Sequence, residues 1–277
     1  MHLTAEQILW ALVLAAHLIL LIVLLGRDRI SRFPWFTAAI ALSTIRLIAD
    51  HLLHGKLTTV AFYWQSYTGM ALDAILGLFV LAELLRRVFS TGKAGLILKA
   101  KGWLGWALIT GSIAIAAVWA WGPWPNWQAI AADKAQLPLL IVVLLGMKGQ
   151  LFTALLTIEV ALLMRIFGKR FGYGWRTHPQ LIAIGLSTSA LGLLIIQVTT
   201  DLIKKNLHLT SREEYEHIVK IFNNFDNARS ALWVLVLLWF IYWLWRDEPG
   251  TSVPEELIPI DVDAAEVAPE LPVEEQS

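Results

Sequence analysis

The sequence contains no cysteine among its 277 residues. This absence excludes a disulfide, a thiol nucleophile, and a zinc or iron–sulfur site with cysteine ligands. Charged residues are also scarce, at 16% of the chain compared with about 25% in typical soluble domains. Apolar residues make up 57%, and this balance predicts an integral membrane protein.

Seven apolar segments are long enough to cross the hydrocarbon core of a bilayer, which takes roughly 20 residues of helix. They are continuous apolar runs without the alternation of barrel strands, so helices are predicted. We therefore expect an all-α fold, with seven transmembrane helices in one domain over residues 1–246. The predicted spans are about 8–26, 34–54, 59–86, 103–122, 138–167, 179–203 and 228–245.

Lysine and arginine residues are unevenly distributed between the two sides of these spans. They cluster after the first, third and fifth spans, whereas the second and fourth are followed only by Lys56 and Lys134. The positive-inside rule therefore predicts an outside N-terminus and a cytoplasmic C-terminus, in a multi-pass protein of the bacterial cytoplasmic (inner) membrane. Tryptophans mark both predicted interfaces: Trp10, Trp64, Trp121, Trp124 and Trp127 outside, and Trp35, Trp103, Trp106, Trp175, Trp243 and Trp245 inside.

Residues 247–277 form a tail with ten acidic residues, five prolines and no lysine or arginine. Because the whole chain has 22 residues of each sign, residues 1–246 carry 22 basic and 12 acidic residues, a net charge of +10. This composition predicts a disordered cytoplasmic tail. The tail either keeps the protein soluble or docks a cytoplasmic protein partner through its "ELIPIDV" segment.

The segment between the last two spans has an amphipathic pattern. Thr210 and Glu213 have the spacing of a capping box, and the apolar residues that follow share one helical face. We expect an amphipathic helix over about 210–225 that lies on the outer surface or caps the bundle.

Several ionisable residues fall inside the predicted spans, where charge is costly and is usually paired within the protein. Arg46 and Asp50 are four residues apart and share one face of the second span. At 1.5 Å rise per residue, Arg46 and Asp73 of the third span lie within reach of each other. We predict an ion pair between them, with Asp50 as a second acceptor and His17 of the first span beside the group.

The fifth span contains Lys148 between Gly146 and Gly149. This span has 30 residues, or roughly 45 Å of helix, against a hydrocarbon core of roughly 30 Å. The helix is therefore expected either to project outside or to bend or break at the glycines. Both alternatives leave Lys148 in the outer half, near the Arg46 group or above it.

A second charged set lies in the inner half, near the arginine-rich loops. Glu83 is expected to form a structural clamp with Arg165 or Arg176, with Glu159 close by. His51 and His54 are spaced so that both could ligate a metal, but we expect interfacial histidines here and predict no metal site. Neither a cofactor nor a nucleic-acid partner is predicted.

Three segments, "FPWFTAAIALSTIR", "YWQSYTGMALDAILGLFVLAELLRRVF" and "FGYGWRTHPQLIAIGL", together contain a pattern that resembles a known group of proteins. Its residues are Phe33-Pro34, Tyr63-Trp64, Glu83 and Trp175-Arg176 with His178. On this pattern the chain resembles a group of seven-span bacterial membrane proteins of the acidobacterial type, to which no activity is assigned. The resemblance implies seven spans and nothing about mechanism.

The charges around Arg46 have two explanations. One is a buried ion-pair network that fixes helix packing; the other is a polar pocket, open to the outside, that binds a small polar or anionic ligand. The preferred hypothesis is a non-enzymatic, receptor-like or accessory membrane protein with no catalytic residue. The alternatives are a transporter or channel that uses Arg46, Asp73 and Lys148, and a membrane-embedded metal-dependent hydrolase.

Overall fold

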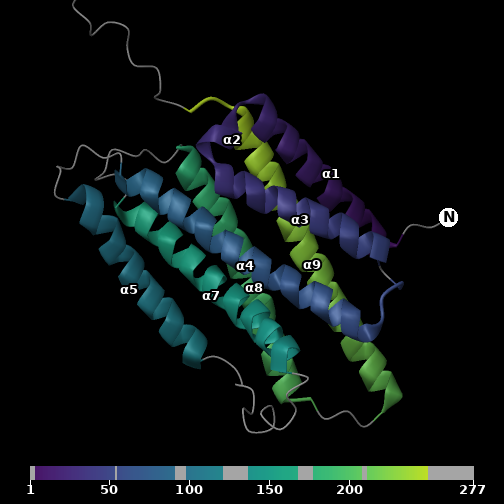
Figure 1. Cartoon of the computed structure of the whole chain (residues 1–277). Coiled ribbons are helices and arrows are strands. Elements are labelled where there is room, and N and C mark those ends of the chain that lie inside the picture. The colour runs from purple at the N-terminus through teal and green to yellow at the C-terminus, as the bar shows by residue number, and fades with distance from the viewer. Residues whose placement is uncertain are drawn as a thin grey trace, which may run out of the picture. The chain divides into compact units, whose positions relative to one another are not determined.

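The structure, a computed structural model, describes residues 4–53, 55–90, 98–120, 137–167, 177–207 and 211–248, and leaves out the side chains of 89–90, 98–108 and 167. Within these ranges the chain forms eight helices and no strand, which confirms the predicted all-α fold (Figure 1). The helices are α1 (Ala5–Gly26), α2 (Arg29–Arg32), α3 (Pro34–Leu53), α4 (Thr59–Ser90), α5 (Leu98–Ala120), α7 (Leu137–Phe167), α8 (His178–Lys205) and α9 (Arg212–Trp245).

Six of these helices are long and apolar enough to cross a membrane: α1, α3, α4, α7, α8 and α9. In α5, the part with described side chains contributes a shorter apolar segment, Ile109–Ala120. The length and composition of these helices are compatible with the predicted membrane protein. The seventh span and the orientation stay predictions.

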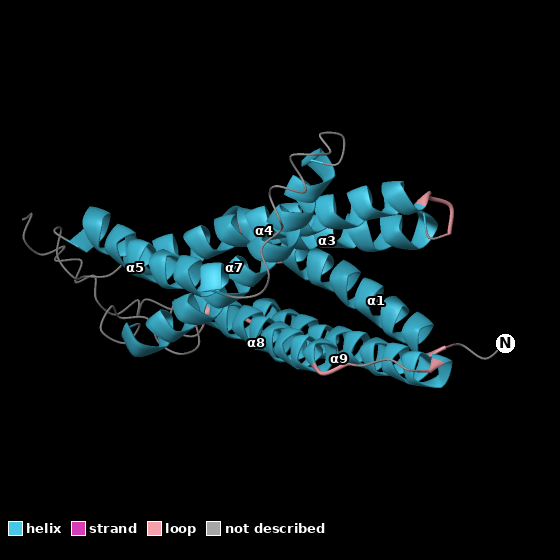
Figure 2. Ribbon diagram, turned by 90° about the horizontal axis from the view of Figure 1, so that it is seen from below, coloured by secondary structure: helices cyan, strands magenta, loops and turns pink. Residues whose placement is uncertain are grey.

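The six long helices close into a ring. Neighbouring helices pack in the order α1, α3, α4, α7, α8 and α9, and α9 packs against α1 again. The helix α5 lies outside the ring, against α7 and α4 (Figures 1 and 2). The ring belongs to one unit of the chain, Met1–Asp247, and the second unit, Glu248–Ser277, contains the rest of the acidic tail.

Contacts between side chains fix the relative directions of three ring helices. The indole N–H of Trp233 in α9 reaches His17 of α1. Beyond the ends of these two helices, Arg29 of α2 reaches the carbonyl of Arg246, the residue after α9. Thus α1 and α9 run in the same direction. Trp10, near the start of α1, instead contacts the carbonyl of Leu47 near the end of α3, so α3 runs the opposite way.

The ring is closed at the end where α9 finishes. Phe36 of α3 meets Phe240 of α9 edge to face, at 5.2 Å between ring centroids, and both side chains are almost fully buried. The carbonyl of Arg246 accepts hydrogen bonds from Arg29 Nη2 at 3.2 Å and from His178 Nε2 at 3.1 Å. Apolar packing and these two donors therefore tie α2, α8 and α9 together.

The helix α7 runs from Leu137 to Phe167 without a break at its glycines, so of the predicted alternatives the break does not occur. These glycines instead allow α7 to approach α4. A Cβ atom on Gly146 would lie 3.0 Å from the carbonyl oxygen of Tyr67, and one on Gly149 would lie 3.1 Å from Cβ of Ala74. Small residues serve the same purpose at helix interfaces in membranes generally.

The expectation of a separate surface helix over 210–225 is also wrong, because α9 continues without interruption from Arg212 to Trp245. Its capping box lies one residue later than predicted. The Ser211 hydroxyl accepts the N–H of Glu214 at 3.2 Å, and the Glu214 carboxylate accepts the N–H of Ser211 at 3.3 Å. The sequence "TSREE" contains two overlapping boxes, and the helix uses the second.

Candidate functional site

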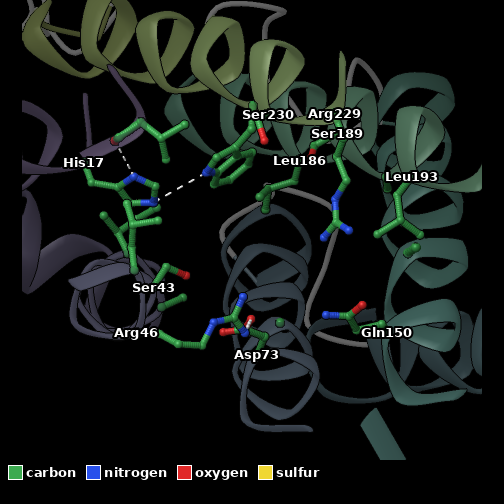
Figure 3. Close-up of a pocket in the computed structure, with 18 of the residues that line it drawn as sticks. His17, Ser43, Arg46, Asp73, Gln150, Leu186, Ser189, Leu193, Arg229 and Ser230 are labelled. Atoms are coloured by element: carbon green, nitrogen blue, oxygen red, sulfur yellow. Dashed lines mark hydrogen bonds and ion pairs between the residues drawn. The ribbon is translucent and has the colours of Figure 1, made fainter. Parts of the chain in front are cut away.

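The helix ring encloses a cavity of about 570 Å³ that is lined by residues of all six ring helices (Figure 3). This volume is within the range of roughly 300–1,000 Å³ that is typical of small-molecule sites. We call the end of the cavity where α1 begins the mouth end. The opposite end is closed by the packed aromatic residues around Phe36.

Arg46 and Asp73 form an ion pair on the cavity wall. The Arg46 guanidinium donates to the Asp73 carboxylate, and Figure 3 shows the two side chains meeting from neighbouring helices. Gly69, one turn before Asp73, makes room for this contact, since a Cβ there would lie 2.7 Å from Cδ of Arg46. The structure thus brings together the two residues whose contact the helix spacing predicts.

This ion pair is accessible to solvent. The side chain of Arg46 is 31% exposed and that of Asp73 is 24% exposed. Asp50 is 48% exposed; its carboxylate lies 3.9 Å from Arg46 Nε and accepts a hydrogen bond from Gln65 at 2.7 Å. The predicted group of Arg46, Asp50 and Asp73 is therefore one connected set that faces the cavity.

Two residues of α9 complete the polar wall and were missed by the sequence analysis. Arg229 points into the cavity from the side opposite Arg46, and Ser230 lies beside it (Figure 3). Arg229 also interacts electrostatically with Asp73. The signal was present, because Asp226 and Arg229 are three residues apart at the start of the last span. Dividing α9 into two helices hid that face.

His17 lies deeper in the cavity, farther from the mouth end. Its side chain is only 2% exposed, its Nδ1 lies 2.8 Å from the carbonyl oxygen of Val13, and its Nε2 accepts the indole N–H of Trp233 at 3.4 Å. A carbonyl can only accept, so Nδ1 carries the proton and Nε2 is the acceptor. Both ring nitrogens are satisfied, and His17 holds α1 against α9.

The cavity lining changes character along its length. Near the mouth end it carries three exposed carboxylates, those of Glu6, Asp50 and Asp226. The arginines and Asp73 follow at the next level, and beyond His17 the wall is mostly apolar. The deep apolar residues include Phe36, Ile40, Val80 and Leu186.

Lys148 does not belong to the Arg46 group. It is not one of the residues that line the cavity, and it interacts electrostatically with Asp201 of α8. The reason is its position on the face of α7 next to α8, whereas Gln150, two residues later, reaches the cavity. The prediction from depth alone could not distinguish these two faces.

Glu83 lies at the closed end, away from the cavity. Its carboxylate accepts the N–H of Phe36 at 3.2 Å, in the first turn of α3, and lies 3.8 Å from Nη2 of Arg87. A buried carboxylate thus caps a helix N-terminus, where negative charge is favourable.

The clamp with Arg165 or Arg176 stays a prediction. Arg165 is in the last turn of α7, and Arg176 lies outside the described residues. Glu159 has one buried carboxylate oxygen that makes no hydrogen bond to any described residue.

Of the two histidines considered as metal ligands, only His51 lies within the described residues. The His51 ring stacks on Trp10, with centroids 4.0 Å apart, and His54 lies outside the described residues. In the part of the chain that is described, no three His, Asp or Glu side chains are grouped so that they could hold a metal ion.

No protein-family model matches the chain, and no curated protein or solved structure is significantly similar to it. The resemblance to acidobacterial seven-span proteins therefore stays a prediction. Function has to be inferred from the chemistry of the cavity.

Proposed function

We propose that this chain is a seven-span protein of the bacterial cytoplasmic (inner) membrane, with its N-terminus outside, that binds a small ligand in the cavity within its helix ring. It acts in a receptor-like or accessory role and catalyses no reaction. The ligand enters from outside, because the mouth end holds the start of α1, which the positive-inside rule assigns to that side.

The observation that supports this proposal best is the partial exposure of the ion pair between Arg46 and Asp73. A purely structural ion-pair network would be expected to pack with its charged atoms shielded. Here both partners line a cavity large enough for a ligand and keep part of their surface accessible. Polar groups that converge in a largely apolar cavity are typical of a binding site.

Binding is favoured over transport by two features of the cavity. Lys148, the third residue of the suggested path, does not line it. At the far end, Phe36 and Phe240 pack against each other with about 1% exposure. A ligand that enters the mouth end therefore meets a closed floor.

A receptor-like protein also needs a way to pass a signal on. The described helices contain no output domain, so the proposed signal leaves through a cytoplasmic partner that contacts the acidic tail or the basic inner loops. Asp247, the first tail residue, lies 3.4 Å from Arg29 and 3.8 Å from Arg27. The base of the tail is thus tied to the end of α1, whose other end lines the cavity.

The absence of cysteine makes a direct test possible, because any thiol introduced by mutation is the only one in the chain. Ser230→Cys places a thiol in the cavity wall, and Thr188→Cys places one on an exposed position of α8 that does not line it. A membrane-impermeant methanethiosulfonate should react with Ser230→Cys in intact cells and leave Thr188→Cys unmodified, because thiols need water to ionise.

The side of the membrane from which the Ser230→Cys thiol reacts decides the outcome. Reaction of Ser230→Cys from outside supports the proposal. If Ser230→Cys reacts neither in intact cells nor in inverted vesicles while the protein remains folded, the cavity is closed to water and the proposed function is wrong.

A further inference from the structure

The charges around the cavity restrict the chemistry of its ligand. Two basic residues line it, Arg46 and Arg229, against four acidic residues: Glu6, Asp50, Asp73 and Asp226. Arg46 and Asp73 neutralise each other, and Asp50 is engaged by Arg46 and Gln65. The charges left for a ligand are the carboxylates of Glu6 and Asp226 and the Arg229 guanidinium, whose interaction with Asp73 is electrostatic only.

Arg229 is suited to bind a carboxylate. Its side chain is exposed, its guanidinium points into the cavity (Figure 3), and it makes no hydrogen bond or ion pair with any described residue. Gln150 points into the same space from α7. A planar guanidinium binds a carboxylate with two parallel hydrogen bonds, and the Gln150 amide can add a third donor.

Asp226 provides the complementary charge. It is three residues before Arg229 on α9, so the two side chains lie on neighbouring parts of one helix face. They nevertheless form no ion pair in the structure. An Asp226 carboxylate next to an Arg229 guanidinium, both accessible, matches a ligand that carries an ammonium group and a carboxylate on the same carbon atom.

The deeper part of the cavity selects for an apolar substituent. The apolar residues of this part of the lining include Ile40, Val80, Leu186 and Trp233, and the cavity lining also contains the hydroxyl residues Ser43, Thr153, Thr157 and Ser189. His17 does not change this character, because its ring nitrogens are occupied by Val13 and Trp233. A charged group would lose its hydration there and would find no opposite charge to compensate for it.

We propose that the ligand of this cavity is a free α-amino acid with a large apolar or aromatic side chain. Its carboxylate binds Arg229 and Gln150, its ammonium binds Asp226, and its side chain fills the apolar floor. A simple anion would have to pass the three carboxylates of the mouth end, whereas a simple amine would leave Arg229 without a counter-charge. This inference rests on the proposed function and names the ligand class of the same cavity.

Three probes of similar shape separate the contributions of the two charges. L-Phenylalanine carries both groups, 3-phenylpropanoate lacks the ammonium, and phenethylamine lacks the carboxylate. Isothermal titration of each probe into the purified full-length protein is expected to give binding of phenylalanine at least about tenfold tighter than that of the other two, because each of them leaves one charged group of the site unpaired.

Variants then assign each charge to its residue. Arg229→Gln should weaken phenylalanine binding at least about tenfold without weakening that of phenethylamine, and Asp226→Asn should weaken phenylalanine binding without weakening that of 3-phenylpropanoate. Arg212→Gln is the matched control on the same helix, because Arg212 is 90% exposed and pairs with Glu216 away from the cavity. It should bind phenylalanine as the unmodified protein does.

Equal binding of 3-phenylpropanoate and phenylalanine would overturn the amino-acid proposal, as would a lack of phenylalanine binding. In either case the reactivity of Ser230→Cys decides separately whether the cavity is open. A reactive thiol leaves the proposed function intact and removes only the amino-acid assignment, whereas an unreactive thiol removes both. Unchanged melting temperatures of the variants show that a loss of binding is not a loss of fold.

Discussion

Gly69 of α4 lies directly against the side chain of Arg46 of α3. A Cβ atom at Gly69 would come within 2.7 Å of Arg46 Cδ and 3.4 Å of its Nη1. The first distance is shorter than real Cβ contacts, so any larger residue must push the arginine aside. The side chain of Arg46 therefore passes directly over Gly69 where it meets Asp73.

Gly69→Ala is expected to displace Arg46 and weaken its contact with Asp73. Alanine in a helix normally gains about 0.5–1 kcal/mol over glycine, so a loss of stability here would report the steric conflict. We expect the conflict to exceed that gain and the melting temperature in detergent to fall. Gly111→Ala in α5 is the control, since a Cβ there meets no described atom within 4 Å, and it should be neutral or stabilising. Equal effects of the two substitutions would contradict this account of Gly69.

Gly185→Ala tests the packing of α8 against α9. A Cβ at Gly185 would overlap the ring of Phe240, which is about 1% exposed and cannot move away freely. Overpacking of this kind costs about 1–3 kcal/mol. Phe240→Leu replaces the phenyl ring with a smaller side chain and should recover part of the stability lost in Gly185→Ala. The Gly185→Ala/Phe240→Leu double variant should therefore be more stable than the sum of the two single effects indicates. Strict additivity in chemical unfolding would show that the two residues do not collide.

Glu83 is predicted to hold the first turn of α3 in place. Glu83→Ala removes the acceptor of the Phe36 N–H and should cost about 2 kcal/mol, the scale of a hydrogen bond to a charged group. Glu83→Gln keeps an oxygen acceptor and should cost less. Hydrogen exchange at the start of α3 should speed up in Glu83→Ala. Glu216→Ala, at an exposed carboxylate of α9, should leave this exchange unchanged; a similar increase there would rule out a specific cap.

Helix periodicity and charge spacing predicted the elements that depend on local sequence. The apolar runs gave the long helices, and the four-residue spacing of Arg46 and Asp50 placed them on one face. The facing position of Asp73 followed from helix rise alone. These features are predictable because helical geometry is fixed by the backbone.

The features that sequence analysis missed depend on tertiary packing. Arg229 could be recognised as part of the site only after the ring had brought α9 opposite α3. The role of Gly146 and Gly149 as close contacts, in place of a helix break, depends on the position of α4. Lys148 and Gln150 differ by two residues and face different neighbours, which a depth estimate cannot distinguish. Which face of a helix meets which neighbour is decided by packing of the whole bundle.

The central claim is that the ionisable residues of α3 and α4 turn inward and meet each other. A double-mutant cycle with Arg46→Ala, Asp73→Ala and the double variant, measured by equilibrium unfolding in detergent, tests it most directly. We predict that each single variant loses about 1–3 kcal/mol, since it leaves a partly buried charge without its partner, and that the double variant loses at least about 1 kcal/mol less than their sum. Effects that add to within about 0.3–0.5 kcal/mol would mean that the two side chains do not interact, and would contradict the account.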